Sequence, residues 1–354
     1  MYINFFLFFS MSFFALFLTR KLAKKAVLVD FPNQRKIHNG AIPLVGGLSI
    51  YLVFNFLLYF GIVKFSPMEN YFILSFLFVF FGFLDDKFKL KYHIKLSCQI
   101  FLSILLVFYG DIKITSLGNV FGMGPIELGL IAPFFTCIII VVVLNALNMI
   151  DGVDGLLAIV SIISFLSFSF VFYLQQNFIL AYVCFVLIVI IIPYVILNLG
   201  ILGERFKVFM GDAGSMFIGF MLLLFIYVAI QNETSAPLQP VTALWFISLP
   251  LMDMVSTVGR RLFNGKSPFM PDREHFHHII QDLGYTPFQT LIILSLVSFV
   301  FAFFGVLFEL QNYPADLIFK FFISMFFIYL FIVIKLSKIK GIKVIKGIKG
   351  TVIP

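Results

Sequence analysis

Long runs of apolar residues alternate with short polar connections along the whole 354-residue chain. A helix of about 20 apolar residues crosses the hydrocarbon core of a bilayer. The runs do not alternate apolar and polar residues over about ten positions, as the strands of a membrane barrel do. The pattern predicts eleven membrane-spanning helices, at 2–19, 43–63, 67–84, 94–109, 126–147, 155–174, 178–198, 213–230, 241–258, 288–308 and 316–334.

The composition excludes a water-soluble protein. Apolar residues make up 61% of the chain and charged residues 12%, and the mean hydropathy is +1.08. A soluble domain of this size needs a polar shell, and a disordered chain needs low hydrophobicity. The predicted fold class is therefore an all-α polytopic membrane protein, with a single domain over 1–354 and a basic tail at 335–354.

The basic residues predict the orientation. With eleven spans, the connections after the odd-numbered spans and the tail hold 22 of the 25 Lys and Arg residues. Cytoplasmic connections are the ones enriched in Lys and Arg, so we expect the N-terminus outside and the C-terminus in the cytoplasm. A net charge of +8 could indicate nucleic-acid binding in a soluble protein. Here orientation accounts for the cations, and we expect no nucleic-acid partner.

Acidic residues and histidines gather on the same predicted side, although orientation does not require them there. Ten acidic residues and all five histidines lie in these connections or at their edges: Asp30, Asp85, Asp86, Asp151, Asp154, Glu204, Asp212, Asp272, Glu274, Asp282, His38, His93, His275, His277 and His278. This gathering predicts a catalytic cleft on the cytoplasmic face.

Adjacent carboxylates, Asp85 and Asp86, follow the apolar run at 67–84. They can both stay ionised if cations or a metal neutralise them, and the alternative is a solvated helix end with salt bridges. Asp212 begins the run at 213–230, where a helix cap and a Mg²⁺ ligand are both compatible with the spacing.

The densest polar segment is 145–155. Asn145 and Asn148 are one helical turn apart and share a face, and Asp151 and Asp154 follow between two apolar runs. Polar groups at membrane depth are costly unless they bind something. Helix capping by the aspartates is the alternative, but the density of polar groups favours a functional site.

The longest predicted cytoplasmic connection, 259–287, is rich in cations. Three arginines, a lysine and three histidines predict a cradle for a polyanion. The histidines His275, His277 and His278 could instead form a zinc site, but no cysteine or second histidine group supplies the usual spacing.

Together the segments DFPNQRKIH with IPLVGG, FGFLDDKFKL, NALNMIDGVDGLL, VFMGDAGS and SPFMPDREHFHHII, in this order, resemble the polyprenyl-phosphate N-acetylhexosamine-1-phosphate transferase superfamily. The similarity extends from about residue 30 to residue 285. Its details resemble the bacterial branch of glycosyltransferase family 4 that transfers N-acetylglucosamine 1-phosphate from a UDP-sugar donor to undecaprenyl phosphate. That reaction begins O-antigen or enterobacterial common antigen synthesis in the inner membrane.

The resemblance implies a role for each motif residue. Asp85 or Asp86 would deprotonate or position the lipid phosphate, Lys95 would contact phosphate, and Asp151 would take part in catalysis. Asp212 would ligate Mg²⁺ with Asn148, and Mn²⁺ could substitute. In the nucleotide pocket, Phe209 would stack on uracil, Asp154 would bind the uracil edge, and Asn198 would line the wall. Arg273, His275, His277 and His278 would hold the pyrophosphate or the sugar. Family precedent also implies a homodimer.

Elementary chemistry is consistent with these roles. Two phosphate compounds repel each other, so their reaction needs cations and precise positioning. We expect direct attack by the lipid phosphate on the sugar-proximal phosphorus, with a covalent aspartyl-phosphate intermediate as the rival. Another UDP-N-acetyl sugar and teichoic-acid linkage synthesis remain alternatives within the family. A secondary transporter for an anion is the alternative from another class, but the chain shows no internal repeat and its polar groups lie on one face.

Overall fold

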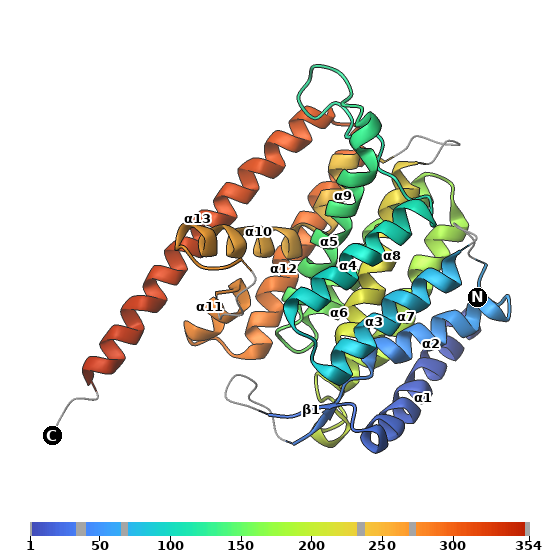
Figure 1. The fold of residues 1–354 in the computed structure, drawn as a ribbon, viewed down its shortest axis with the longest axis vertical. Coiled ribbons are helices and arrows are strands. Elements are labelled where there is room, and N and C mark those ends of the chain that lie inside the picture. The colour runs from blue at the N-terminus through green and yellow to red at the C-terminus, as the bar shows by residue number, and fades with distance from the viewer. Residues whose placement is uncertain (1, 33–39, 65–69, 232–237, 269–273, 351–354) are drawn as a thin grey trace.

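The computed structural model describes residues 2–32, 40–64, 70–231, 238–268 and 274–350. The described chain is almost entirely helical (Figure 1). Its elements are α1 (Tyr2–Ala26), β1 (Val29–Asp30), β2 (Ile42–Pro43), α2 (Gly46–Tyr59), α3 (Tyr71–Phe88), α4 (Tyr92–Phe108), η1 (Gly129–Ile131), α5 (Ala132–Ile150), α6 (Leu156–Leu174), α7 (Phe178–Asn198), η2 (Glu204–Phe206), α8 (Asp212–Ile230), α9 (Pro240–Phe246), α10 (Ser248–Phe263), α11 (Phe276–Asp282), α12 (Pro287–Leu310) and α13 (Ala315–Gly350).

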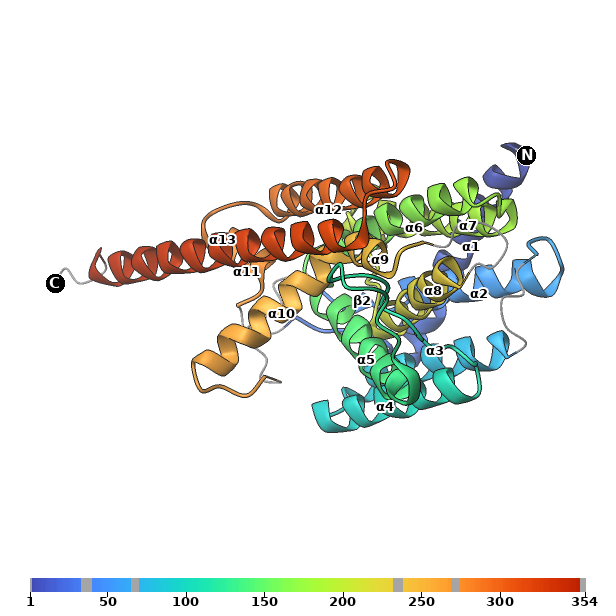
Figure 2. The same ribbon diagram turned by 90° about the horizontal axis from the view of Figure 1, so that it is seen from above.

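Helix α8 is the centre of the bundle. In its most apolar stretch 83% of the residues are buried inside the protein, and it packs against α2, α3, α5 and α6. Seen from above, α8 lies between α7 and α3, while α12 and α13 lie beyond α6 (Figure 2). Because α8 carries Asp212 in its first turn, its central position places this carboxylate among the ends of several other helices.

Multi-pass membrane character is confirmed, although fewer helices qualify as spans than the eleven predicted. In the described ranges, seven helices are long and apolar enough to cross a bilayer, and α9 with α10 would make an eighth. Two of the other apolar helices, α2 and α4, are shorter than 18 residues. The last turn of α3 carries Asp85, Asp86 and Lys87, and these charges interrupt its apolar character.

The predicted span at 241–258 is not one continuous helix, which corrects the sequence interpretation. Helices α9 and α10 meet at an angle of 85°, and Ile247 between them has φ −122° and ψ 19°, outside the helical region. Pro250 lacks a backbone N–H, and proline is tolerated in the first turn of a helix but not in its interior. Restarting the helix at Ser248 places Pro250 in a first turn, which explains the break.

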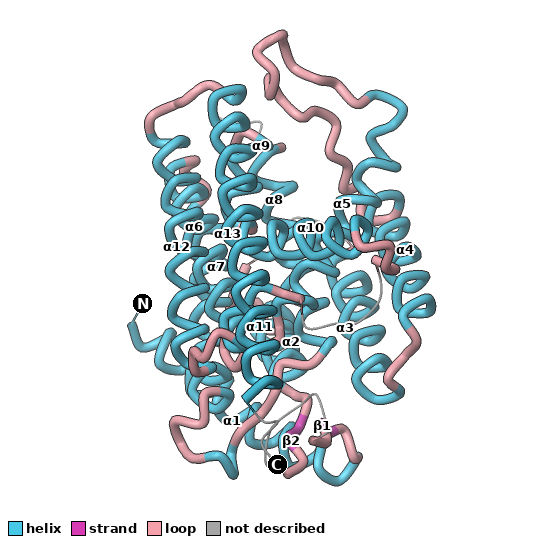
Figure 3. Tube along the Cα trace, turned by 90° about the vertical axis from the view of Figure 1, so that its left-hand side faces the viewer, coloured by secondary structure: helices cyan, strands magenta, loops and turns pink. Residues whose placement is uncertain are grey.

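A short strand pair was also not predicted. Strands β1 and β2 pair antiparallel, with Val29 opposite Pro43 and Asp30 opposite Ile42. They lie at one end of the bundle (Figure 3). The next residue, Leu44, bridges to Phe209, so this small sheet ties the start of α2 to the segment before α8.

The ends of the helices meet in two groups, as an up-and-down bundle requires. At one end, Lys95 contacts Asp85 and Asp212, which joins α3, α4 and α8. At the other end, Tyr227 donates to the carbonyl of Asp111 and Gln231 to that of Lys113. Helices α4 and α8 therefore run in one direction through the bundle and α3 in the opposite one, as the predicted alternation of sides requires.

Glycines allow α2 and α3 to approach the first turn of α8. A Cβ atom at Gly82 would lie 2.5 Å from the Cα atom of Ala213, and one at Gly47 would lie 1.9 Å from that of Gly214. No real Cβ atom tolerates such a distance, so alanine at either position would force the backbones apart.

We expect Gly82→Ala to lower the thermal stability of the purified protein because the obstructing atoms belong to backbone. Overpacking of this kind costs about 1–3 kcal/mol. Gly259→Ala in α10 is the control, since a Cβ atom there meets nothing within 4 Å. Equal unfolding temperatures for the two variants would contradict the tight contact.

Candidate active site

A lysine and two carboxylates form the centre of the site. Lys95, in the first turn of α4, places its Nζ atom 2.7 Å from Oδ2 of Asp85 and 3.1 Å from Oδ1 of Asp212. The same Nζ atom lies 3.2 Å from Oδ1 of Asn148, whose amide nitrogen donates to Asp212. Four helices thus each contribute one of the predicted residues to one cluster, which we call the Lys95 cluster (Asp85, Lys95, Asn148 and Asp212).

Asp86 faces the start of α8. Its Oδ1 accepts from the backbone N–H of Asp212 at 2.8 Å, and its Oδ2 accepts from that of Ala213 at 3.1 Å. The first N–H groups of a helix have no partner within the helix, and a carboxylate there is favoured by the helix dipole. Gly211 has φ 75°, and a Cβ atom there would lie 2.5 Å from Asp86, so glycine permits this contact. Asp86 therefore fixes the position of Asp212.

Asp85 and Asp86 lie beyond the predicted 67–84 span, in a place that disfavours negative charge. Burial, followed by the charge of Asp212, raises the pKa of the Asp85 carboxyl to about 6. Burial and the same neighbour raise the pKa of Asp86 well above its usual range. Closely spaced carboxylates with raised pKa values favour an additional cation.

Asn198 joins the turn after α5 to the segment before α8. Its side-chain oxygen accepts from the N–H of Gly155, and its nitrogen donates to the carbonyl of Val208 at 2.8 Å. Asn198 is 2% exposed. These bonds give it a positioning role, and direct contact with a nucleotide stays a prediction.

Asp154 and Phe209 lie on these two joined segments. Asp154 is partly exposed and forms an ion pair with Lys207 at 2.8 Å. The backbone of Phe209 donates to Pro43 and accepts from Val45 and Gly46, so the strand-like contact fixes the segment while the ring stays partly exposed. Asp151, at the end of α5, is exposed. These two joined segments, 151–155 and 207–211, carry Asp154 and Phe209 and lead along the chain to Asn148 and Asp212 of the Lys95 cluster, and we call them the rim.

The histidine segment, residues 275–278, contacts the same rim. A Cβ atom at Gly152 would lie 2.2 Å from Nε2 of His277, so His277 packs directly on the turn after α5. The rings of His275 and His277 are stacked, with centroids 5.7 Å apart and an angle of 8° between their planes. The ring centroid of His278 lies 4.2 Å from that of His277. Arg273 lies outside the described residues.

Two contributors to the site were not singled out from the sequence. Asp253 of α10 lies 2.8 Å from Nδ1 of His275, and Lys207 holds Asp154. The signal for Asp253 was present, because it is an ionisable residue inside the apolar run 241–258. Lys207 was indistinguishable from the other basic residues of the connections.

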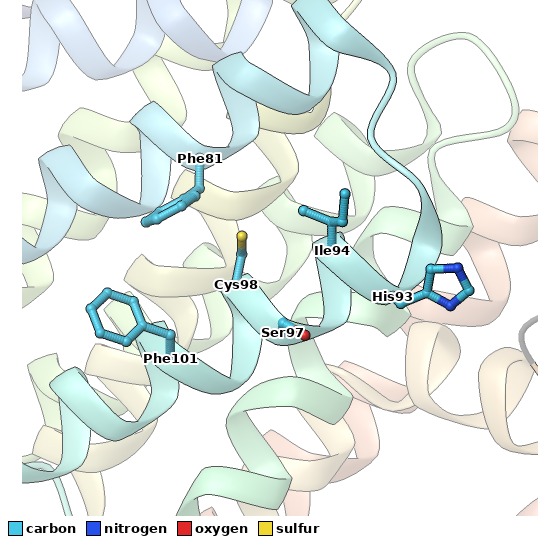
Figure 4. A pocket seen from close by; sticks show the side chains of 6 residues that line it. All are labelled: Phe81, His93, Ile94, Ser97, Cys98 and Phe101. Atoms are coloured by element: carbon cyan, nitrogen blue, oxygen red, sulfur yellow. The ribbon is translucent and has the colours of Figure 1, made fainter.

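An apolar groove of about 400 Å³ lies between α3 and α4 (Figure 4). It is lined by Phe81, His93, Ile94, Ser97, Cys98 and Phe101. Phe81 and Cys98 also line a small cavity that contains Asp85, Lys95 and Asp212. An apolar surface therefore continues up to the polar cluster.

Comparisons of the sequence with known proteins identify the family of this chain. The model of glycosyl transferase family 4 matches residues 69–230, the part of the chain that carries the Lys95 cluster. The undecaprenyl-phosphate alpha-N-acetylglucosaminyl 1-phosphate transferase of Escherichia coli K12 is 41% identical over 317 residues, covering 89% of this chain and 86% of its own. The proteins of the same name from Yersinia pestis (39% identical, covering 91% and 87%) and Salmonella typhi (38%, covering 89% and 86%) are also similar. This chain therefore belongs to glycosyl transferase family 4, as a relative of these phosphosugar transferases.

Proposed function

We propose that this protein transfers N-acetylglucosamine 1-phosphate from UDP-N-acetylglucosamine to undecaprenyl phosphate. The products are undecaprenyl-pyrophosphoryl-N-acetylglucosamine and UMP. One phosphoanhydride bond replaces another, so the reaction needs no further energy source. The Lys95 cluster is the observation that carries the proposal, because it combines one ammonium, two carboxylates and an amide where α3, α4, α5 and α8 meet.

The cluster has the donor set that Mg²⁺ prefers. Asp85, Asp212 and Asn148 each place an oxygen atom within 3.2 Å of Lys95 Nζ, so these oxygens already surround one cation. Among the described residues, no three His, Cys, Asp or Glu side chains are arranged to hold a metal. Mg²⁺ is commonly held by only one or two carboxylates together with substrate phosphates. We propose that Asp212, with Asn148, holds Mg²⁺, which would neutralise charge between the two substrates; Mn²⁺ could replace it.

The protein's own residues supply positioning and charge. Lys95 places a cation beside Asp85, where the lipid phosphate would enter from the apolar surface of α3 and α4. Asp86 is engaged by two backbone N–H groups, which suits a residue that positions Asp212 better than one that forms a covalent intermediate. We therefore propose direct attack by the lipid phosphate. Asp151, exposed at the same rim, would take part in catalysis. Phosphosugar trapped on the protein without lipid would contradict direct attack.

The remaining rim residues suit the donor. Asp154 and Phe209 would bind the uracil by its edge and its face, and Arg273 with the three histidines would hold the pyrophosphate or the sugar. This assignment rests on the proximity of His277 to Gly152 and on the joining of the two rim segments by Asn198.

We further propose eleven membrane crossings in the bacterial inner membrane. The seven long helices, the bent pair counted once, and α2, α3 and α4 give eleven. The site would face the cytoplasm, because 22 of 25 basic residues fall in the connections of that side and cytoplasmic connections are enriched in basic residues. A homodimer stays a prediction.

The reaction is tested with purified protein in detergent, undecaprenyl phosphate and a panel of UDP-N-acetyl sugars. We expect UMP release only when the lipid is present, and a lipid product whose mass corresponds to one added phospho-N-acetylglucosamine. Preference for another sugar would correct the donor alone. Uptake of a substrate into vesicles without UMP release would instead indicate a transporter.

A further inference from the structure

The strongest buried polar cluster outside the proposed reaction centre surrounds Asp253. Its Oδ2 lies 2.8 Å from Nδ1 of His275, and its Oδ1 accepts from the backbone N–H of Phe276 at 2.9 Å. The phenol of Tyr329 donates to the same Oδ1 at 3.2 Å. These contacts join α10, the start of α11 and α13, which lie close together in Figures 1 and 2.

This cluster is closed to solvent. Asp253 is 3% exposed, Tyr329 5% and His275 7%. A buried carboxylate is stable where it is paired and hydrogen-bonded, and both oxygens of Asp253 have partners. Such an arrangement holds the residues around it in one geometry.

The partners of His275 select one position for its proton. A carboxylate only accepts hydrogen bonds and a guanidinium only donates them. Nδ1 faces the Asp253 carboxylate, while Nε2 faces Nη2 of Arg261 at 3.5 Å. Arg261 is itself 2% exposed and donates to the carbonyl of Pro268 at 2.7 Å. The proton of His275 therefore belongs on Nδ1, and Nε2 accepts.

The cluster continues to the proposed reaction site through ring stacking. His275 stacks on His277, and His277 packs on Gly152, next to Asp151. We propose that Asp253 is a positioning residue: through His275 it fixes the proton and ring plane that orient His277 at the phosphosugar site. This proposal rests on the proposed function and refines it. His275 then acts within the protein, while His277, 3% exposed beside Gly152, and the partly exposed His278 would lie nearest the donor.

A double-variant cycle tests this route. Removing the hydrogen-bonded partner of a metal-ligating histidine typically costs about 10- to 100-fold. By analogy, we expect Asp253→Asn to lower kcat by about that factor. We expect a similar loss for His275→Gln and no further loss in the double variant, because both changes break one route. The KM for the UDP-sugar should change little.

Tyr329→Phe is the matched control. It removes one hydrogen bond to Asp253 but leaves the His275 bond in place, so its loss of kcat should be much smaller. Thermal unfolding of each variant shows whether a loss of activity reflects a loss of folded protein. Losses that multiply in the double variant, or an equal loss in Tyr329→Phe, would overturn the proposal.

A second measurement does not depend on the activity of the variants. In the unaltered protein labelled with ¹⁵N-histidine, NMR should show the His275 proton on Nδ1, with the signal assigned by its absence in His275→Gln. A proton on Nε2 would refute the positioning route. If the unaltered protein shows this proton position yet releases no UMP, the proposed function fails while the internal geometry stands.

Discussion

Replacing Asp212 by Asn is expected to lower turnover by on the order of 10³-fold, the largest effect of any single change. Loss of one group that stabilises charge in a transition state costs about 10²–10³-fold, and this variant would lose a metal ligand as well. The measurement is UMP release after chelation and stepwise return of Mg²⁺. The Mg²⁺ concentration needed for half-maximal activity should rise along with the fall in turnover.

Asp111→Asn is the control for this experiment. Asp111 pairs with Lys113 at the opposite end of the bundle, with 83% of its side chain exposed, so its activity and Mg²⁺ requirement should match those of the unaltered protein. Near-normal turnover in Asp212→Asn would remove the metal assignment. It would leave family membership intact, since that rests on sequence identity.

Lys95→Met should produce the second largest loss, on the order of 10²-fold in turnover, because it removes the cation between Asp85 and Asp212. Stability should fall as well. Breaking a buried ion pair costs about 3–5 kcal/mol, and the exposure of 23% of the Lys95 side chain reduces this figure. Mg²⁺ should restore part of the lost stability by replacing the missing charge, which thermal unfolding with and without the ion measures.

Lys91→Met provides the comparison, because Lys91 lies four residues earlier, at the N-cap of α4, and is exposed. It should retain both activity and stability. If the two lysine variants behave alike, the ammonium of Lys95 has no special place in the reaction.

The sequence predicted the membrane class and most of the Lys95 cluster for a simple physical reason. Carboxylates and amides at the ends of apolar runs stand out, because their burial is costly without a purpose. Which groups contact one another was not predictable. Asp85 and Asp86 are neighbours in sequence, yet one faces Lys95 and the other caps α8, a division set by the rotation of the last turn of α3.

The bend between α9 and α10 was missed because hydropathy averages over a window and does not register one non-helical residue at Ile247. Asp253 was missed with it, since it was assigned to a continuous span. The Asn198 bridge is likewise invisible in sequence, because it joins Gly155 and Val208 across two connections.

The near contact of Gly47 and Gly82 with the backbone of α8 bears on how the protein can move. Backbone meets backbone at these two points, and farther along the helices Phe54 packs on Phe217 and Phe78 on Phe220. These contacts leave α2 and α3 little room to slide or rock against α8. The wall that holds Asp212 should therefore stay still during a catalytic cycle. Opening and closing around the donor would then fall to the part of the site where the histidine segment meets the turn after α5.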